Sequence, residues 1–114
     1  MDLEWWPELK RAAELADVEV DTGLEYGFGE PVRLRVDFHR FPYVRDDGRA
    51  VALAGHPAGW RAVAERFARE RVVNLSRGGV LSLPVVPAGP GFDVIVERIA
   101  TTSLDLYQEL LELE

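Results

Sequence analysis

The chain has no cysteine, one lysine (Lys10) and only two side-chain amides, Asn74 and Gln108, among its 114 residues. Without cysteine it has no disulfide framework, no thiolate metal site and no cysteine nucleophile. No stretch approaches the roughly 20 apolar residues that a membrane-spanning helix needs. The acidic start of the chain lacks the basic and apolar regions of a signal peptide. We therefore expect a cytoplasmic protein with no membrane partner.

Positive charge is also scarce, because 13 basic residues stand against 20 acidic ones and the formal net charge is −7. Nonspecific binding to nucleic acid needs a basic surface, which this net charge opposes. We therefore expect no nucleic-acid partner. Many charged residues and few thermolabile amides are typical of heat-adapted proteins. The composition is thermophile-like in this respect.

Residues with catalytic or metal-binding potential are few. His39 and His56 do not have the spacing of a metal site, and the acidic residues are not clustered as ligands. Ser76, Ser82 and Ser103 lie in no nucleophile motif. We therefore expect no metal and no cofactor and assign no catalytic residue. Enzymatic activity stays open as the less favoured interpretation.

The best-defined element is a helix within Gly55–Arg71. Trp60, Val63 and Phe67 recur, together with two alanines, at the spacing of one helical face. Charged residues of opposite sign at i, i+4 spacing occupy the other face. Pro57 fits the first helical turn, where its missing N–H costs nothing. We expect this helix to pack on a sheet that the flanking segments supply.

The first half of the chain is expected to supply much of that sheet. Residues 32–39 alternate apolar and polar side chains, which predicts a strand with one buried and one exposed face. Residues 18–20 are expected to form a short strand, and the glycine-rich segment 21–29 a loop. The dipeptide Asp47-Gly48 predicts a hairpin turn that returns the chain as a strand over 50–54.

The second half adds three expected strands, at residues 72–75, 80–86 and 92–99. Pro42 and Pro84 cannot donate to a strand ladder, so each indicates a bend, a bulge or a sheet edge.

Two terminal helices complete the predicted pattern. The first covers residues 3–16, and the second runs from about 102 to 113 after a capping box formed by Thr102 and Asp105. The second has two apolar seams, which indicates two neighbours, one of them another subunit. The order α-β-β-β-α-β-β-α predicts an α+β fold: a mainly antiparallel sheet of about four to six strands with helices packed on one face, in a single domain over 1–114.

Candidate binding residues lie in two places. One is a basic and aromatic strip consisting of Arg33, Arg35, His39, Arg40, Tyr43 and Arg45, and the other is the adjacent pair Trp5 and Trp6. Arginine and aromatic residues are enriched at interface hot spots. Alternatively, the arginines pair with acidic neighbours and solvate the sheet, or the strip binds a small anion or nucleotide. The two tryptophans have a core role or a ligand-stacking role as their alternatives.

One family resemblance rests on the run V-A-L-A-G-H-P-A-G-W-R-A-V-A-E-R-F-A at 51–68 and the segment F-D-V-I-V-E-R-I at 92–99. Taken as strand, turn, amphipathic helix and strand, these segments resemble small immunity-type domains of polymorphic toxin systems. The resemblance covers less than half of the chain. It implies a non-enzymatic protein whose acidic surface binds and blocks a basic toxin, and it assigns no residue.

Three functions are therefore considered. The favoured one is a non-catalytic protein-interaction or regulatory domain that forms a homo-oligomer. The second is a small-ligand-binding module with a pocket between sheet and helices, lined by Trp5, Trp6, Tyr26, Phe28 or Tyr43. The third is an enzyme in which His39 or His56 acts as acid or base, which would require a cleft where the histidine meets a carboxylate.

Overall fold

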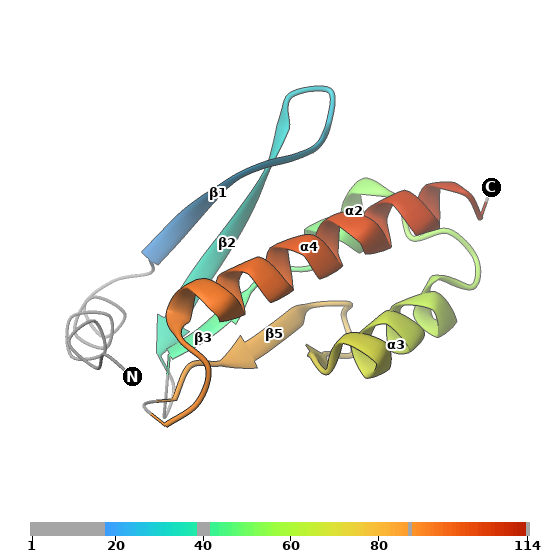
Figure 1. The fold of residues 1–114 in the computed structure, drawn as a ribbon. Coiled ribbons are helices and arrows are strands. Elements are labelled where there is room, and N and C mark those ends of the chain that lie inside the picture. The colour runs from blue at the N-terminus through green and yellow to red at the C-terminus, as the bar shows by residue number, and fades with distance from the viewer. Residues whose placement is uncertain (1–17, 39–41, 87, 114) are drawn as a thin grey trace.

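The computed structural model describes residues 18–38, 42–86 and 88–113 (Figure 1). Within them, five strands form one antiparallel sheet in the order β1-β2-β3-β5-β4, and helices pack against it. The predicted α+β class is confirmed. The elements are β1 (Val18–Gly27), β2 (Glu30–Phe38), β3 (Pro42–Arg45), α2 (Arg49–Leu53), α3 (Trp60–Arg71), β4 (Asn74–Leu75), β5 (Leu81–Pro84) and α4 (Phe92–Leu111).

The two faces of the sheet differ in burial as the alternation predicts. On β2, Val32, Leu34 and Val36 are buried, whereas Arg33 and Arg35 are exposed. The long helix α4 lies across the buried face and contacts β1, β2, β3 and β5 (Figure 1). Each buried aliphatic side chain contributes roughly 1.5–3 kcal/mol of transfer free energy. The outer face is left open by the described helices.

β1 and β2 form a long hairpin, so the expected loop over 21–29 is wrong. Only Phe28 and Gly29 form the turn, and the closed end projects beyond the other strands (Figure 1). The register shifts in the middle of β1, near the point where Thr22 Oγ1 donates to the Val32 carbonyl over 2.7 Å. Pairing with β2 therefore holds a glycine-rich segment in an irregular strand that local propensity does not predict.

The chain after β3 turns into the short helix α2, so the expected hairpin and the strand over 50–54 are wrong. Asp47 and Gly48 do adopt positive φ, 58° and 73°, as an Asp-Gly turn requires. Asp46 Oδ1 accepts the N–H of Gly48 and the N–H of Leu81, each over 2.9 Å. This side chain links the turn to β5. The long-range hydrogen bond to Leu81 therefore favours the path of the chain into α2.

The central helix is confirmed as α3, although it begins at Trp60 and Pro57 lies ahead of it. Phe67 is buried in the core, and Trp60 packs against the core while staying partly exposed. Gly59, with φ of 83°, precedes the first helical residue. The predicted apolar stripe therefore faces the core, and the expected first turn at Pro57 is a non-helical turn instead.

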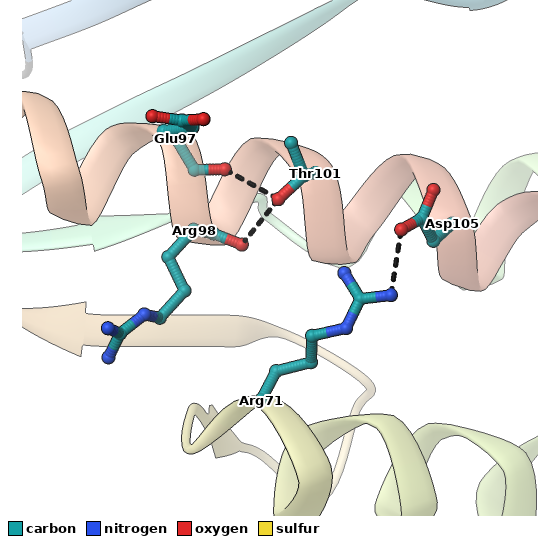
Figure 2. Close-up of polar contacts among 5 residues, drawn as sticks. All are labelled: Arg71, Glu97, Arg98, Thr101 and Asp105. Carbon is teal, nitrogen blue, oxygen red and sulfur yellow. Dashed lines mark hydrogen bonds and ion pairs between the residues drawn. The ribbon is translucent and has the colours of Figure 1, made fainter.

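Two ion pairs join α3 to α4. Arg71 Nη2 lies 2.8 Å from Asp105 Oδ2 (Figure 2), and Arg66 Nη2 lies 3.1 Å from Glu109 Oε1. All four side chains are partly exposed, so each pair contributes about 0–1 kcal/mol. The pairs align the helices, while the buried side chains between them supply most of the stability.

α4 is one continuous helix of 20 residues, so both the strand expected over 92–99 and the helix start expected at Thr102 are wrong. Ile95, Ile99 and Leu106 are buried on one face at helical spacing. β-branched residues favour strands locally, but tertiary burial of this face prevails. Thr102 therefore lies in the middle of the helix and is completely buried.

The order of elements behind the resemblance to immunity-type domains is not present. Residues 51–53 belong to α2, and residues 92–99 belong to α4. Both segments that the resemblance takes as strands are thus helical, and only the amphipathic helix between them is retained.

β4 and β5 are shorter than the strands that the sequence predicts over 72–75 and 80–86. Pro42 is the first residue of β3 and Pro84 the last of β5, where a missing N–H is tolerated. Both strands lie inside the sheet, and its edges are β1 and β4. The prolines therefore mark strand ends rather than a sheet edge.

The N-terminal helix and the absence of a membrane-spanning helix are the remaining predictions. The helix expected over 3–16 lies outside the described residues. Among the described residues, no helix combines the length and hydrophobicity needed to cross a bilayer.

Candidate functional site

Part of the predicted basic and aromatic strip lies on the outer face of the sheet. The register places Arg35 of β2 beside Arg45 of β3, so their side chains share this face. The strip residues found there are Arg33, Arg35, Tyr43 and Arg45. The remaining predicted binding residues, Trp5, Trp6, His39 and Arg40, lie outside the described residues.

Acidic neighbours compensate two arginines of this strip. Arg35 Nε lies 3.2 Å from Asp47 Oδ2, and Arg45 Nη2 lies 2.7 Å from Asp37 Oδ2. The second pair is the less exposed, with 29% and 22% of the two side chains accessible. These contacts are what the solvated-face interpretation predicts for Arg35 and Arg45.

The edge strand β1 adds two more carboxylates to the outer face. Glu19 is the register partner of Arg35, and Asp21 that of Arg33. Arg33 is exposed and makes no ion pair with any residue in the described part of the chain. The outer face is therefore a surface of mixed charge, with Arg33 as its least compensated cation.

A groove of about 540 Å³ opens beside this face, where β2 extends beyond β3. β3 pairs only with residues 35–38 of β2, so residues 30–34 have a partner strand on one side only among the described residues. Arg49 at the start of α2 forms an ion pair with Glu30. The charged groups in the lining are Glu19, Glu30, Asp47, Arg33, Arg35 and Arg49, and their formal charges balance.

Phe28 lies at the tip of the projecting hairpin, and its side chain is fully exposed. Its φ of 53° lies in the left-handed region, which costs a residue other than glycine roughly 1–2 kcal/mol. Together with Gly29, with φ of 78°, it occupies the two turn positions where Asn-Gly is favoured. The residue therefore lowers stability through its backbone and gains nothing from burial.

A buried hydrogen-bond network fastens the hairpin to the core. Ser103 Oγ of α4 donates to Asp46 Oδ2 over 2.7 Å, and Tyr26 Oη lies 2.7 Å from the same Oγ. Since the hydroxyl proton of Ser103 is directed to Asp46, Tyr26 is the donor to Ser103. The Tyr26 ring also meets Tyr107 edge-on, with centroids 5.4 Å apart. β1, α4 and the turn before α2 are thereby linked.

Burial perturbs both ionisable members of this network. Burial raises the pKa of Asp46, and the hydrogen bonds from Gly48, Ser103 and Leu81 offset only part of that rise. Burial likewise raises the pKa of Tyr26 to about 12. Because Asp46 is completely buried, we assign this network to the structure of the hairpin rather than to contact with a ligand.

The aromatic pocket considered for a small ligand is not assembled by the described residues. Tyr26 is buried on the inner side of the sheet, Tyr43 lies on the outer face, and Phe28 lies at the hairpin tip. These three side chains therefore do not line a common pocket.

His56, the described histidine, is exposed in the turn before α3. Its ring meets Trp60 edge-on, with centroids 5.6 Å apart, and it forms no hydrogen bond with a described carboxylate. Within the same residues, no three potential ligand side chains are grouped so that they could hold a metal ion. The geometry therefore supplies no described acid–base pair at this histidine.

The sequence suggested Phe28 only as a possible pocket residue and not as an exposed turn residue, and it suggested no role for Asp46. The dipeptide Phe28-Gly29 between two apolar stretches could have indicated a two-residue hairpin turn, because such a turn needs positive φ at both positions. For Asp46 the sequence contains no such signal, since its partners Leu81 and Ser103 are distant in the chain.

No protein-family model matches the chain, and neither a curated protein nor a solved structure matches it significantly.

Proposed function

We propose that this chain is a non-catalytic protein-interaction domain and that the β1–β2 hairpin is its contact element. The observation that carries the proposal is Phe28, an aromatic side chain fully exposed at the tip of a projecting hairpin. Its backbone conformation is unfavourable for phenylalanine. Residues that break local rules without a gain in stability are concentrated at functional sites.

The surroundings of Phe28 favour a protein over a small molecule as the partner. A single projecting ring has no walls that could enclose a small ligand, whereas it fits an apolar pocket on another protein. Most residues that line the groove beside β2 belong to the same hairpin, and the lining offers carboxylates and guanidinium groups in equal number. A mixed polar rim around an aromatic anchor is the usual composition of a non-obligate interface.

Photo-crosslinking of the full chain tests this proposal. Phe28 is replaced by p-benzoylphenylalanine, and the protein is irradiated in extracts of its source. We expect one crosslinked partner that unmodified wild-type protein in excess displaces. The matched position is Val72, which is also apolar, exposed and at positive φ (56°) but lies at the end of α3.

The partner should crosslink at position 28 and not at position 72. Adding Arg33→Glu to the position-28 protein should weaken the crosslink, because Arg33 is the least compensated cation near the hairpin. Equal crosslinking at both positions, or none at position 28, would refute the assignment of the hairpin as the contact element.

Self-association is the second candidate, and the end of α4 favours it. Leu111 and Leu113 expose 47% and 43% of their surfaces, and they belong to the two apolar seams predicted for this segment. We propose that a second copy covers them. Light scattering over a dilution series should show a mass above that of the monomer, and Leu111→Glu should lower it; a monomer at every concentration would contradict this candidate.

A further inference from the structure

A second groove, on the other side of the hairpin, is separate from the surface described above. It has a volume of about 440 Å³ and lies between the edge strand β1 and the first half of α4. Its apolar lining consists of Val20, Leu24, Phe92, Val96 and Ala100. Leu24 exposes 36% of its surface. The groove thus combines an apolar floor with an open strand at its side.

Among the described strands, β1 is an edge strand of the sheet. β1 pairs with β2 on one side, and no strand of the described residues lies on its other side. Its regular part is Val18–Asp21. Beyond it the edge is closed, because Asp21 Oδ1 binds the N–H of Gly23 and Thr22 Oγ1 binds the N–H of Leu24. An added strand therefore has room beside residues 18–21 only.

The charge around the groove is of one sign. Asp93 and Glu97 contribute carboxylates to the lining, Asp21 borders it from β1, and no basic residue lines it. Asp93 and Glu97 form no ion pair with any described residue. The hydroxyl of Thr101, also in the lining, donates to the Glu97 carbonyl of its own helix over 2.8 Å (Figure 2). The polar groups that remain available to a partner are therefore negatively charged carboxylates, which accept hydrogen bonds.

We propose that this groove binds an extended basic segment of another protein, which pairs with the edge of β1 and inserts its alternate apolar side chains between β1 and α4. Strand addition takes affinity from backbone hydrogen bonds and specificity from the pockets that receive alternate side chains. Asp93 and Glu97 of α4 lie in the lining of the groove, where their carboxylates attract the arginine or lysine side chains of that segment.

Charge also distinguishes this partner from a second copy of the chain. A second β1 would bring its own Glu19, Asp21 and Glu25 to the acidic edge, and like charges across a strand pair are destabilising. The net charge of −7 on each copy adds to the repulsion.

The test uses the full chain and a short fluorescent peptide of alternating arginine and valine. Fluorescence anisotropy should show saturable binding, and an otherwise identical peptide of alternating glutamate and valine should not bind. In NMR spectra, the peptide should shift the methyl signals of Val20, Leu24 and Val96. Absence of binding, or methyl shifts confined to other regions, would overturn the proposal.

Two variants locate the site. Neutralising the rim with Asp93→Asn and Glu97→Gln should weaken binding by at least about tenfold. The control carries Glu65→Gln and Glu70→Gln on the exposed face of α3, makes the same change in net charge, and should alter the affinity by less than about twofold. Equal loss in both proteins would mean nonspecific charge attraction and would overturn the proposal.

Blocking the floor provides the second test. Val96→Arg places a cation in the groove and should abolish binding, whereas Val94→Arg, at an exposed position on the same helix outside the lining, should not. Circular dichroism verifies that both variants fold. Retained binding by Val96→Arg would overturn the proposal. NOEs from Trp5 or Trp6 to the Val96 methyls, or a dimer that Val96→Arg dissociates, would also overturn it, because either result would identify another occupant of the groove.

Discussion

Phe28 and Asp46 are single residues whose positions cost stability. Phe28 holds a positive φ at an exposed turn, and Asp46 holds a carboxyl group in the core. Only Asp46 offsets this loss of stability, through hydrogen bonds from Gly48, Leu81 and Ser103. This contrast separates Asp46, a structural polar residue, from Phe28, a candidate contact residue.

Phe28→Asn should raise the stability of the protein. Asparagine tolerates the left-handed conformation, and Asn-Gly is the favoured pair for a two-residue hairpin turn. We expect the free energy of unfolding to rise by about 0.5–1 kcal/mol, measured by chemical denaturation. In the crosslinking experiment, an excess of this variant should fail to displace the partner. A less stable Phe28→Asn protein would contradict this account of the turn.

Asp46 should make stability depend on pH. Because burial raises its folded-state pKa above the unfolded value, the folded protein binds a proton more tightly than the unfolded chain. This contribution is fully present below the unfolded pKa and is lost as the pH rises through the folded pKa.

Asp46→Asn removes this titration and isolates the effect. The free energy of unfolding of the wild type minus that of the variant should increase as the pH falls from roughly 7 to roughly 4. Urea denaturation of both proteins over this range measures it, and the other titrating groups cancel in the difference. A constant difference would show that Asp46 has the same pKa in both states.

At the scale of elements, α4 illustrates how tertiary contacts override local pattern. Its first half is rich in β-branched residues and its middle contains two buried hydroxyl residues, Thr102 and Ser103. Ser103 joins Asp46 to Tyr26, whereas Thr102 Oγ1 is buried without a hydrogen-bond partner in the described structure. We therefore expect the hydroxyl of Ser103 to stabilise the fold and the buried hydroxyl of Thr102 to destabilise it.

Thr102→Val and Ser103→Ala should therefore change stability in opposite directions. Replacing the unpartnered hydroxyl by a methyl group should stabilise by about 0.5–1 kcal/mol. Ser103→Ala should destabilise by about 1–3 kcal/mol, because it leaves the Asp46 carboxyl and the Tyr26 hydroxyl without their shared partner. Thermal denaturation of both variants measures the difference, and each serves as the positional control of the other.

The turn before β5 makes close contact with α2 and α3 at Gly79. Its φ is 90°, and an added Cβ would lie 3.1 Å from Val51 Cγ2 and 3.3 Å from Trp60 Cζ3. Gly79→Ala should lower the free energy of unfolding by about 1–3 kcal/mol. Gly78→Ala is the control, since its nearest neighbour would be 4.0 Å away, and should stay within about 0.5 kcal/mol of the wild type.

For the whole molecule, charge determines which partners approach. The net charge is −7, and the strip that appears basic in sequence is compensated in space by Asp37 and Asp47 and flanked by Glu19 and Asp21. Both features oppose a polyanion. A basic or mixed-charge protein surface is the complementary partner.

Binding to DNA should consequently be undetectable. We expect no change in the anisotropy of a fluorescent duplex at about 50 mM salt, where phosphate contacts are strongest. A saturable, salt-sensitive response would instead show that the paired arginines are released to bind phosphate.

Patterns that depend on residues near in sequence determined much of the fold. The alternation along β2 predicted both faces of that strand, and the spacing of Trp60 and Phe67 predicted α3, because burial on one side leaves a period of two or 3.6 residues in the sequence. These patterns were enough for the α+β class and the antiparallel sheet. They also placed Arg33, Arg35, Tyr43 and Arg45 on one strip, which the sheet register keeps together.

Long-range contacts determine the structure of the segments for which those patterns are ambiguous. Residues 92–99 suit a strand or a helix, and only the sheet beneath them selects a helix, because it buries the face that contains Ile95 and Ile99. Likewise, the Asp-Gly turn leads into α2 because Asp46 binds Leu81 and Ser103, which are far away in the chain. The pairing of Arg35 and Arg45, the exposure of Phe28 and the groove beside β1 depend on the same long-range contacts, for which the sequence holds no local signal.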